Sequence, residues 1–203
     1  LIQLDDMLDE TDYPNLMAGV EQKFWDYSRV DGKIYAIPFS RYDTTPYLSY
    51  ARKDWLEKLN IDPATLKTVE DYHEMLRAFT FDDPDGNGVN GDTYGLALNK
   101  GLISAGHFTI PGLASAYGVP GYGASIFYRD KDGKMTFSWI QPGLKPDLEL
   151  LNKMYKEGMI NKEFTAKDES ALVEDVTSGK IGMAYGSNWG TWYPYNNVFK
   201  KDG

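Results

Sequence analysis

The stretch SGKIGMAYGSNWGTWYPY, which runs from Ser178 to Tyr195, decides the fold. Its first part, KIGMAY, is a short apolar run that follows a Ser-Gly pair, and this pattern is typical of a buried strand bounded by a turn. A glycine turn follows at Gly186, and Asn188 can cap a helix that begins there. The stretch therefore predicts a strand that leads through a tight turn into the first turn of a helix.

Large aromatic side chains crowd this turn. Tyr185 ends the predicted strand, and Trp189, Trp192 and Tyr193 follow the glycine. Ligands of α/β domains bind where strands end and helices begin, and an aromatic ring offers a flat face to the C–H surface of a sugar. A tryptophan after a strand can instead fill the core. Because three large rings lie beside glycines, we take these four residues as candidate ligand-binding residues.

Strands alternate with helices on the amino-terminal side of this stretch. The patterns predict strands within 31–39, 46–51 and 94–98 and helices over 53–60, 69–81, 146–157 and 169–178. A hairpin is expected around Asp132-Gly133, with a type I′ turn. The helix from Pro146 is expected to carry Leu148, Leu151, Met154 and Tyr155 on one face. This alternation predicts an α/β fold, while the glycine-rich segment 101–123 has no clear period.

Composition narrows the possible partners. The 203 residues include 30 Asp and Glu against 21 Lys and Arg, and the formal net charge is -9. This charge repels phosphate backbones, so nucleic acid is not an expected partner. Cysteine is absent, which removes disulfides, thiolate zinc sites and cysteine nucleophiles. No run approaches the roughly 18 apolar residues of a membrane-spanning helix.

Common catalytic motifs are missing from the sequence. Two histidines, His73 and His107, cannot form a multi-histidine zinc site alone, and no HExxH, GxSxG or phosphate-binding GxxxxGK[ST] motif occurs. His73 is expected on a helix surface. A pair of carboxylates about 5 to 10 Å apart, as glycosidases use, cannot be recognised from sequence among thirty acids.

The segment FDDPDGNGVNGDTYGL, from Phe81 to Leu96, resembles a calcium-binding loop. Calcium prefers six to eight oxygen ligands, which such loops supply from alternating positions. Those positions hold Asp83, Asp85, Asn87 and, through its backbone carbonyl, Val89. The twelfth position is Tyr94 instead of glutamate, and Asp92 is the candidate for the late carboxylate. The alternative is a turn without an ion; we favour a single structural Ca²⁺ between a helix and a strand.

Five segments in series resemble one protein family. They are DGKIYAIP, YARKDWLEKLNI, DPDGNG with DTYGL, LLNKMYKEGMINKEF and GKIGMAYGSNW. Together they are similar to the extracellular solute-binding proteins, family 1, which are the lipoprotein-type substrate-binding proteins of Gram-positive carbohydrate ABC transporters. The resemblance covers nearly the whole chain but only the central part of such a protein.

The resemblance implies a periplasmic-binding-protein-like fold of type II, in which two α/β lobes close on a sugar about a hinge. Residues 1–38 would belong to the first lobe, 39–46 to the hinge crossing, and 47–203 to an incomplete second lobe. Arg41 and Asp43 would lie at the hinge as ligand-binding candidates. Trp189 matches the sugar-stacking tryptophan of the family. The calcium loop also matches, although it is one residue longer here, before Asp92.

The resemblance implies that the protein binds a carbohydrate, namely an oligosaccharide, without catalysis, and that the bound sugar is then imported. The expected protein is a monomer that works with an ABC transporter membrane permease, on the cell surface of a Gram-positive bacterium, with its lipid anchor outside this segment. Two alternatives stay open. One is a secreted glycoside hydrolase or lyase fragment with an aromatic sugar platform, and the other is a calcium-dependent interaction module.

Overall fold

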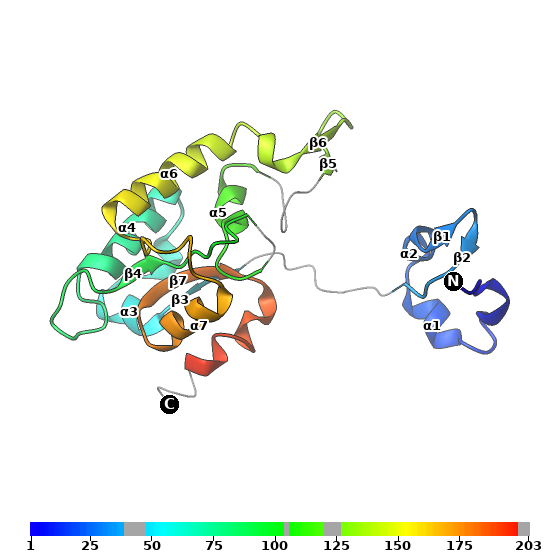
Figure 1. Ribbon diagram of the computed structural model, residues 1–203, viewed down its shortest axis with the longest axis horizontal. Helices are drawn as coiled ribbons and strands as arrows, with labels where there is room; N and C mark the ends of the chain where they lie inside the picture. The colour runs from blue at the N-terminus through cyan, green and yellow to red at the C-terminus, as the bar shows by residue number, and fades with distance from the viewer. Residues whose placement is uncertain (39–47, 104–105, 120–126, 199–203) are drawn as a thin grey trace. The chain divides into compact units, whose positions relative to one another are not determined.

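The computed structural model describes residues 1–38, 48–103, 106–119 and 127–198, except for the side chain of Trp189. The chain forms two compact units, Leu1–Thr44 and Thr45–Gly203 (Figure 1). The boundary falls inside the predicted crossing 39–46, whose residues lie outside the described parts. The assignment of the two units to two lobes therefore stays a prediction.

The first unit is a small arrangement of short elements. It contains η1 (Asp5–Met7), α1 (Pro14–Gly19), α2 (Gln22–Tyr27), β1 (Arg29–Val30) and β2 (Lys33–Ile34). β1 and β2 pair across the predicted turn, where Asp31 and Gly32 have φ of 50° and 78°. The carboxylate of Asp5 accepts the N–H of Ile34 at 2.9 Å, and this bond holds the pKa of Asp5 below its usual value.

The second unit is built on a three-stranded sheet with the order β3-β7-β4. Its strands are β3 (Leu48–Ala51), β4 (Tyr94–Leu96) and β7 (Ile181–Gly186). The central strand β7 is the predicted strand KIGMAY, which confirms that prediction. β3 runs antiparallel to β7 and β4 runs parallel to it, so the carboxyl ends of β4 and β7 lie at the same edge.

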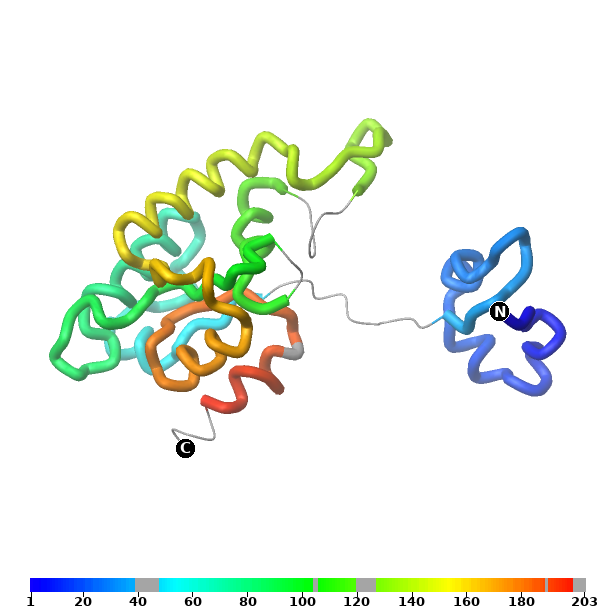
Figure 2. The backbone as a smooth tube through the Cα atoms, viewed as in Figure 1, coloured from blue at the N-terminus to red at the C-terminus, as the bar shows by residue number. Residues whose placement is uncertain are grey.

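Helices cover the sheet, and the tube in Figure 2 follows their connections. They are α3 (Lys53–Lys58), α4 (Val69–Phe81), α5 (Pro111–Ala116), α6 (Leu144–Glu157) and α7 (Glu169–Thr177), with the 3-10 turns η2 (Pro63–Thr65), η3 (Ser138–Ile140) and η4 (Asn188–Thr191). α4 and α7 pack on β7, while α5 contacts both α6 and β7. None of the helices in the described residues is long and apolar enough to span a bilayer.

The predicted start of α4 is confirmed in atomic detail. The hydroxyl of Thr68 accepts the N–H of Asp71, and the carboxylate of Asp71 accepts the N–H of Thr68, so the two residues form a capping box. These hydrogen bonds satisfy two backbone groups that a helix start leaves unpaired. The cap fixes the residue at which α4 begins.

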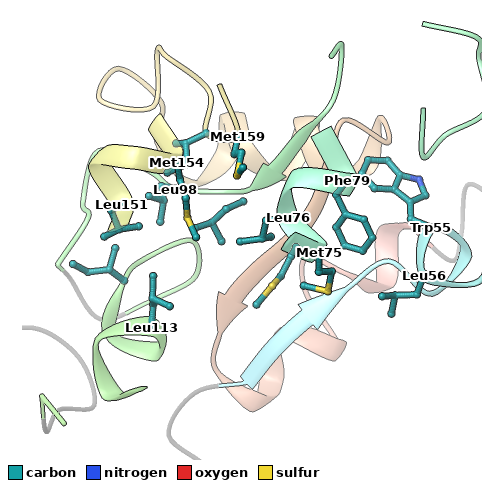
Figure 3. Packing of buried hydrophobic residues seen from close by; sticks show 14 residues of the cluster. Trp55, Leu56, Met75, Leu76, Phe79, Leu98, Leu113, Leu151, Met154 and Met159 are labelled. Atoms are coloured by element: carbon teal, nitrogen blue, oxygen red, sulfur yellow. The ribbon is translucent and has the colours of Figure 1, made fainter. Parts of the chain in front are cut away.

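Two glycines let α4 lie directly on the sheet. A Cβ at Gly182 would lie 2.3 Å from the ring of Phe79, and a Cβ at Gly95 would lie 2.3 Å from the carbonyl oxygen of Leu76. Phe79 has no exposed surface and meets Trp55 edge to face, with 5.5 Å between the ring centroids. The surrounding core joins α3, α4, β4, α5 and α6 (Figure 3).

The hairpin around Asp132-Gly133 is confirmed, but the predicted type of its turn was wrong. In the hairpin of β5 (Phe127–Arg129) and β6 (Met135–Phe137), Gly133 has a positive φ of 76° but Asp132 does not, so the turn is not type I′. Asp130 shapes it instead, because its carboxylate accepts the N–H groups of Asp132 and Lys134. The segment 101–123, without a clear period, contains helix α5.

The core face of α6 also differs from the prediction. Leu151 and Met154 are buried, but Leu148 is 42% exposed and Tyr155 is 36% exposed. The buried face instead includes Asp147. Because a polar residue occupies a buried position of this helix, the spacing of the hydrophobic residues alone does not indicate which face is buried.

His73 lies in the interior and not on the helix surface. Its exposed fraction is 7%, and its Nε2 lies 3.0 Å from Glu157 Oε2. The contact joins α4 to the last turn of α6.

Candidate functional site

The candidate site lies at the carboxyl ends of the parallel strands β4 and β7. The loop after β4 returns to β7, where the N–H of Phe108 donates to the carbonyl oxygen of Tyr185 at 2.8 Å. A Cβ at Gly186 would lie 2.1 Å from Nδ1 of the buried His107, so only glycine fits there. The two loops therefore meet at the edge of the sheet where α/β domains bind ligands.

Asn99 shapes the loop after β4. Its side-chain amide donates to the carbonyl oxygen of His107 at 2.9 Å, and its side-chain oxygen accepts the N–H of Gly101 at 2.7 Å. The backbone N–H of Asn99 also donates to Phe108. This buried amide holds the loop closed on itself, which keeps His107 against the glycine at the end of β7.

Tyr50 of β3 holds the turn after β7. Its hydroxyl lies 2.7 Å from the carbonyl oxygen of Ser187 and 3.2 Å from that of Asn188. The ring of Tyr50 packs on that of Tyr195, with 4.3 Å between the centroids, and burial raises the pKa of Tyr50 above its usual value. The hydroxyl of Tyr50 thus holds the two backbone carbonyl groups that directly precede Trp189.

The predicted aromatic residues have different environments. Trp192 is 80% exposed and Tyr193 is 45% exposed, so both rings are available to a ligand. Tyr185 is half-buried, because its ring packs against Gly112 of α5, where a Cβ would lie 2.3 Å away. Burial raises the pKa of Tyr185 well above its usual value.

Trp189 lies in η4, directly after the turn, but its side chain is outside the described parts. Where a helix was predicted after the strand, the structure has only this short 3-10 helix. Arg41 and Asp43 also lie outside the described residues. The structure thus places Tyr185, Trp192 and Tyr193 in one segment and leaves the other three candidates as predictions.

Sequence reasoning missed the residues that support the site. Tyr50, Asn99 and Tyr195 gave no signal, because their roles depend on strand register and loop return. His107 was visible in the sequence but could not be placed. Without the pairing of Tyr50 with Ala184 in β7, nothing connects residue 50 with residue 187.

The predicted metal loop joins α4 to β4. The Asn87 side-chain amide donates to Asp85 at 2.9 Å and to Asp92 at 2.8 Å, so these three side chains converge. The carboxylate of Asp83 accepts the N–H of Gly88 at 3.2 Å. The exposed Val89 donates its N–H to the side-chain oxygen of Asn87.

A lysine lies beside the same loop. The ammonium of Lys58 donates to the carbonyl oxygen of Asp83 and lies 3.7 Å from its carboxylate. Desolvation raises the pKa of Asp83, but the Gly88 N–H and the Lys58 charge outweigh it, so the pKa is below its usual value. Within the described residues, no three acidic or histidine side chains are arranged to hold a metal. The oxygen atoms of this loop are suitable ligands for calcium, although the carboxylate of Asp83 lies beside Lys58.

The fold defines the class of protein. The chain has an α/β fold of the periplasmic-binding-protein-like class, as its structural neighbours show. One is FusA, an ABC-transporter substrate-binding protein of S. pneumoniae solved in complex with kestose. It matches with a TM-score of 0.75 and 23% identity over 98% of this chain and 40% of that one.

The family follows from the sequence matches. The profile of the bacterial extracellular solute-binding proteins matches residues 1–201, so the chain belongs to that family. It is 33% identical over 174 residues to lipoprotein LipO of Bacillus subtilis, which covers 85% of this chain and 32% of LipO. It is 32% identical over 180 residues to the polygalacturonan/rhamnogalacturonan-binding protein YtcQ of the same organism, covering 87% and 33%. The chain thus spans about a third of the length of these relatives.

Proposed function

We propose that the full-length protein binds an oligosaccharide without catalysis and delivers it to the membrane permease of an ABC importer. The observation that carries the proposal is the aromatic turn after β7, held at the carboxyl edge of the parallel strands in a member of the solute-binding family. The names of YtcQ and FusA, both of which describe carbohydrate ligands, support it.

The chemistry of the turn suits a saccharide. The exposed rings of Trp192 and Tyr193 offer flat apolar faces, and Trp189 would stack on a sugar ring from the turn that Tyr50 fixes. A preorganised platform lowers the cost of ordering side chains on binding. Closure about a hinge at 39–46, with Arg41 and Asp43 close to the ligand, would then bury the bound sugar.

Truncation of the stacking residue tests the proposal. In the full-length protein we expect Trp189→Ala to weaken binding by about 1 to 2 kcal/mol, as aromatic truncation does at a binding hot spot. Calorimetric titration with pectic oligogalacturonides and fructo-oligosaccharides measures this loss. Tyr155→Ala, a half-exposed ring on α6, is the matched control and should bind like the wild type. Equal affinities in Trp189→Ala and the wild type would place the site elsewhere.

The enzyme alternative is tested in the same samples. Chromatography after incubation with each oligosaccharide should return the ligand intact, because a transport protein passes its cargo on unchanged. Cleavage products from the purified protein would favour the glycoside hydrolase or lyase reading. The remaining parts of the proposal are a monomer and attachment to the cell surface as a lipoprotein, in keeping with the name of LipO.

A structural calcium ion belongs to the same proposal. Asp83, Asp85, Asn87, Asp92 and the carbonyl of Val89 would hold the ion and tie α4 to β4. The convergence of Asp85 and Asp92 on Asn87 supports this set. Binding requires the carboxylate of Asp83 to turn away from Lys58.

Calcium should raise the melting temperature of the full-length protein, and EDTA should lower it, because an ion bound only by the folded state stabilises that state. Asp85→Asn should reduce the calcium effect, whereas Asp132→Asn, in the exposed hairpin turn, should keep it. Metal content measured by mass spectrometry gives a direct count. Absence of both bound metal and a thermal shift would leave the loop as a turn.

A further inference from the structure

Asp147 is a carboxylic acid buried in the core face of α6. Its exposed fraction is 0%. Among the residues that the structure describes, no hydrogen bond or ion pair reaches either carboxyl oxygen. The residue lies in the first turn of the helix and one turn before the buried Leu151. An unpaired buried carboxyl is costly, and its cost rises steeply when it carries a charge.

Two tyrosines, Tyr117 and Tyr185, are close enough to this carboxyl group to feel its charge. Tyr117 at the end of α5 and Tyr185 of β7 both have a raised pKa, and burial is the first cause in each. The nearby Asp147 is the second cause for Tyr117, whereas for Tyr185 it follows Tyr72. The residue that precedes α6 packs closely on the end of α5, because a Cβ at Gly143 would lie 2.0 Å from the carbonyl oxygen of Tyr117. The start of α6 therefore packs on Tyr117 at the end of α5, and Gly112 of the same α5 packs on the ring of Tyr185, one residue before the end of β7.

The charged and titratable neighbours do not compensate a negative charge. Tyr72 of α4 acts on Tyr185, and Glu70 acts on Tyr117. Neither tyrosine nor glutamate can carry a positive charge, so none of these groups offsets a negative charge on Asp147. Within the described residues, no lysine, arginine or histidine forms an ion pair with Asp147. Burial raises the pKa of Asp147 to about 7, so the carboxyl changes its charge near neutral pH.

We propose that Asp147 is a positioning residue that makes the turn after β7 respond to pH. While the carboxyl is neutral, the first turn of α6 stays packed on Tyr117 and Tyr185, and the aromatic turn keeps its place. Once the carboxyl is charged, desolvation drives the first turn of α6 away from these tyrosines, so Tyr185 loses its support. Sugar binding then weakens as pH rises; this consequence alone rests on the proposed function.

The first test needs no sugar. The full-length protein, carrying ¹³C in its tyrosine rings, is titrated by NMR between about pH 5 and pH 9, the range around the titration of this carboxyl. Signals of Tyr117 and Tyr185 are assigned from the Tyr→Phe variants. Both should shift together with a midpoint of about 7. Asp147→Asn should abolish the transition, whereas Glu149→Gln, exposed on the same helix, should leave it unchanged.

Two outcomes would overturn the proposal. One is the absence of a transition in the wild type, and the other is the same transition in Asp147→Asn. If the asparagine variant does not fold, Asp147→Leu provides the same comparison with an apolar side chain. A structural role alone would change the melting temperature without removing a tyrosine transition.

The second test measures the functional consequence. Affinity for the oligosaccharide identified in the binding screen should fall several-fold from pH 6 to pH 8 in the wild type and stay constant in Asp147→Asn. An equal fall in the variant would contradict the link between this carboxyl and binding. If no oligosaccharide binds, the proposed function fails, while the sugar-free titration still decides the role of Asp147.

Discussion

Gly182 shows how one missing side chain sets the packing of the second unit. The ring of Phe79 occupies the place that a Cβ at residue 182 would need, so α4 rests directly on the central strand. A buried phenylalanine cannot move far in a close-packed interior. The small residue in the middle of β7 is thus a requirement of helix packing.

We expect Gly182→Ala to destabilise the full-length protein by about 1 to 3 kcal/mol, the usual cost of overpacking a core. Urea unfolding measures the loss. Gly19→Ala is the control, because a Cβ at that position would meet no atom within 4 Å apart from its chain neighbours and the backbone of its own helix. An alanine at residue 182 with unchanged stability would mean that Phe79 and α4 move aside freely.

Single residues of the site differed in how far they could be predicted. The aromatic rings at 185, 192 and 193 stood out by composition and position, and two of them are exposed as a ligand surface requires. Tyr50 could not be recognised, since its contact with the turn spans more than 130 residues of sequence. Such contacts depend on strand order, which side-chain patterns within one strand do not contain.

At the scale of elements, strong local signals gave correct helices and strands. α4 was predicted because its cap and its apolar spacing agree, and β7 because an apolar run ends in glycines. α5 was missed, since six residues with a proline start carry too little periodicity. The core face of α6 was misjudged because Asp147 occupies a position where a hydrophobic residue is expected.

The stability of α6 should depend on pH through Asp147. Its pKa is 3.8 in the unfolded reference and about 7 in the folded protein, so folding binds a proton between these values. The contribution of this group to the free energy of unfolding is therefore full below about pH 4 and declines as pH rises to about 7.

Asp147→Asn should remove this decline. Above pH 7 the variant should be more stable than the wild type by about 1 to 3 kcal/mol, because the asparagine amide stays neutral in the core whereas the unpaired carboxyl group becomes charged. Chemical unfolding at pH 5 and pH 8 measures the difference, with Glu149→Gln as the control. A wild type that is equally or more stable than Asp147→Asn at pH 8 would show that the carboxylate has found a partner.

At the scale of the whole molecule, the two units differ in their capacity to fold. Trp25 and Ile34 are the buried hydrophobic residues of the first unit among the described parts of the chain. So small a core cannot offset the conformational entropy of some forty residues. The second unit contains both core clusters and can support a cooperative fold.

We therefore expect a peptide of residues 1–38 to show no cooperative thermal transition by circular dichroism, whereas residues 48–203 should unfold cooperatively. A melting transition in the short peptide would contradict the reasoning from core size. The division into two units was predicted from resemblance to a family, because composition alone contains no marker for it.

The pairing of Leu48 with Gly186 has a mechanical consequence. In the strand register, the first described residue of the second unit lies opposite the last residue of β7, directly before the aromatic turn. A displacement of Leu48 would therefore also displace Gly186 and, with it, the backbone that carries the aromatic rings.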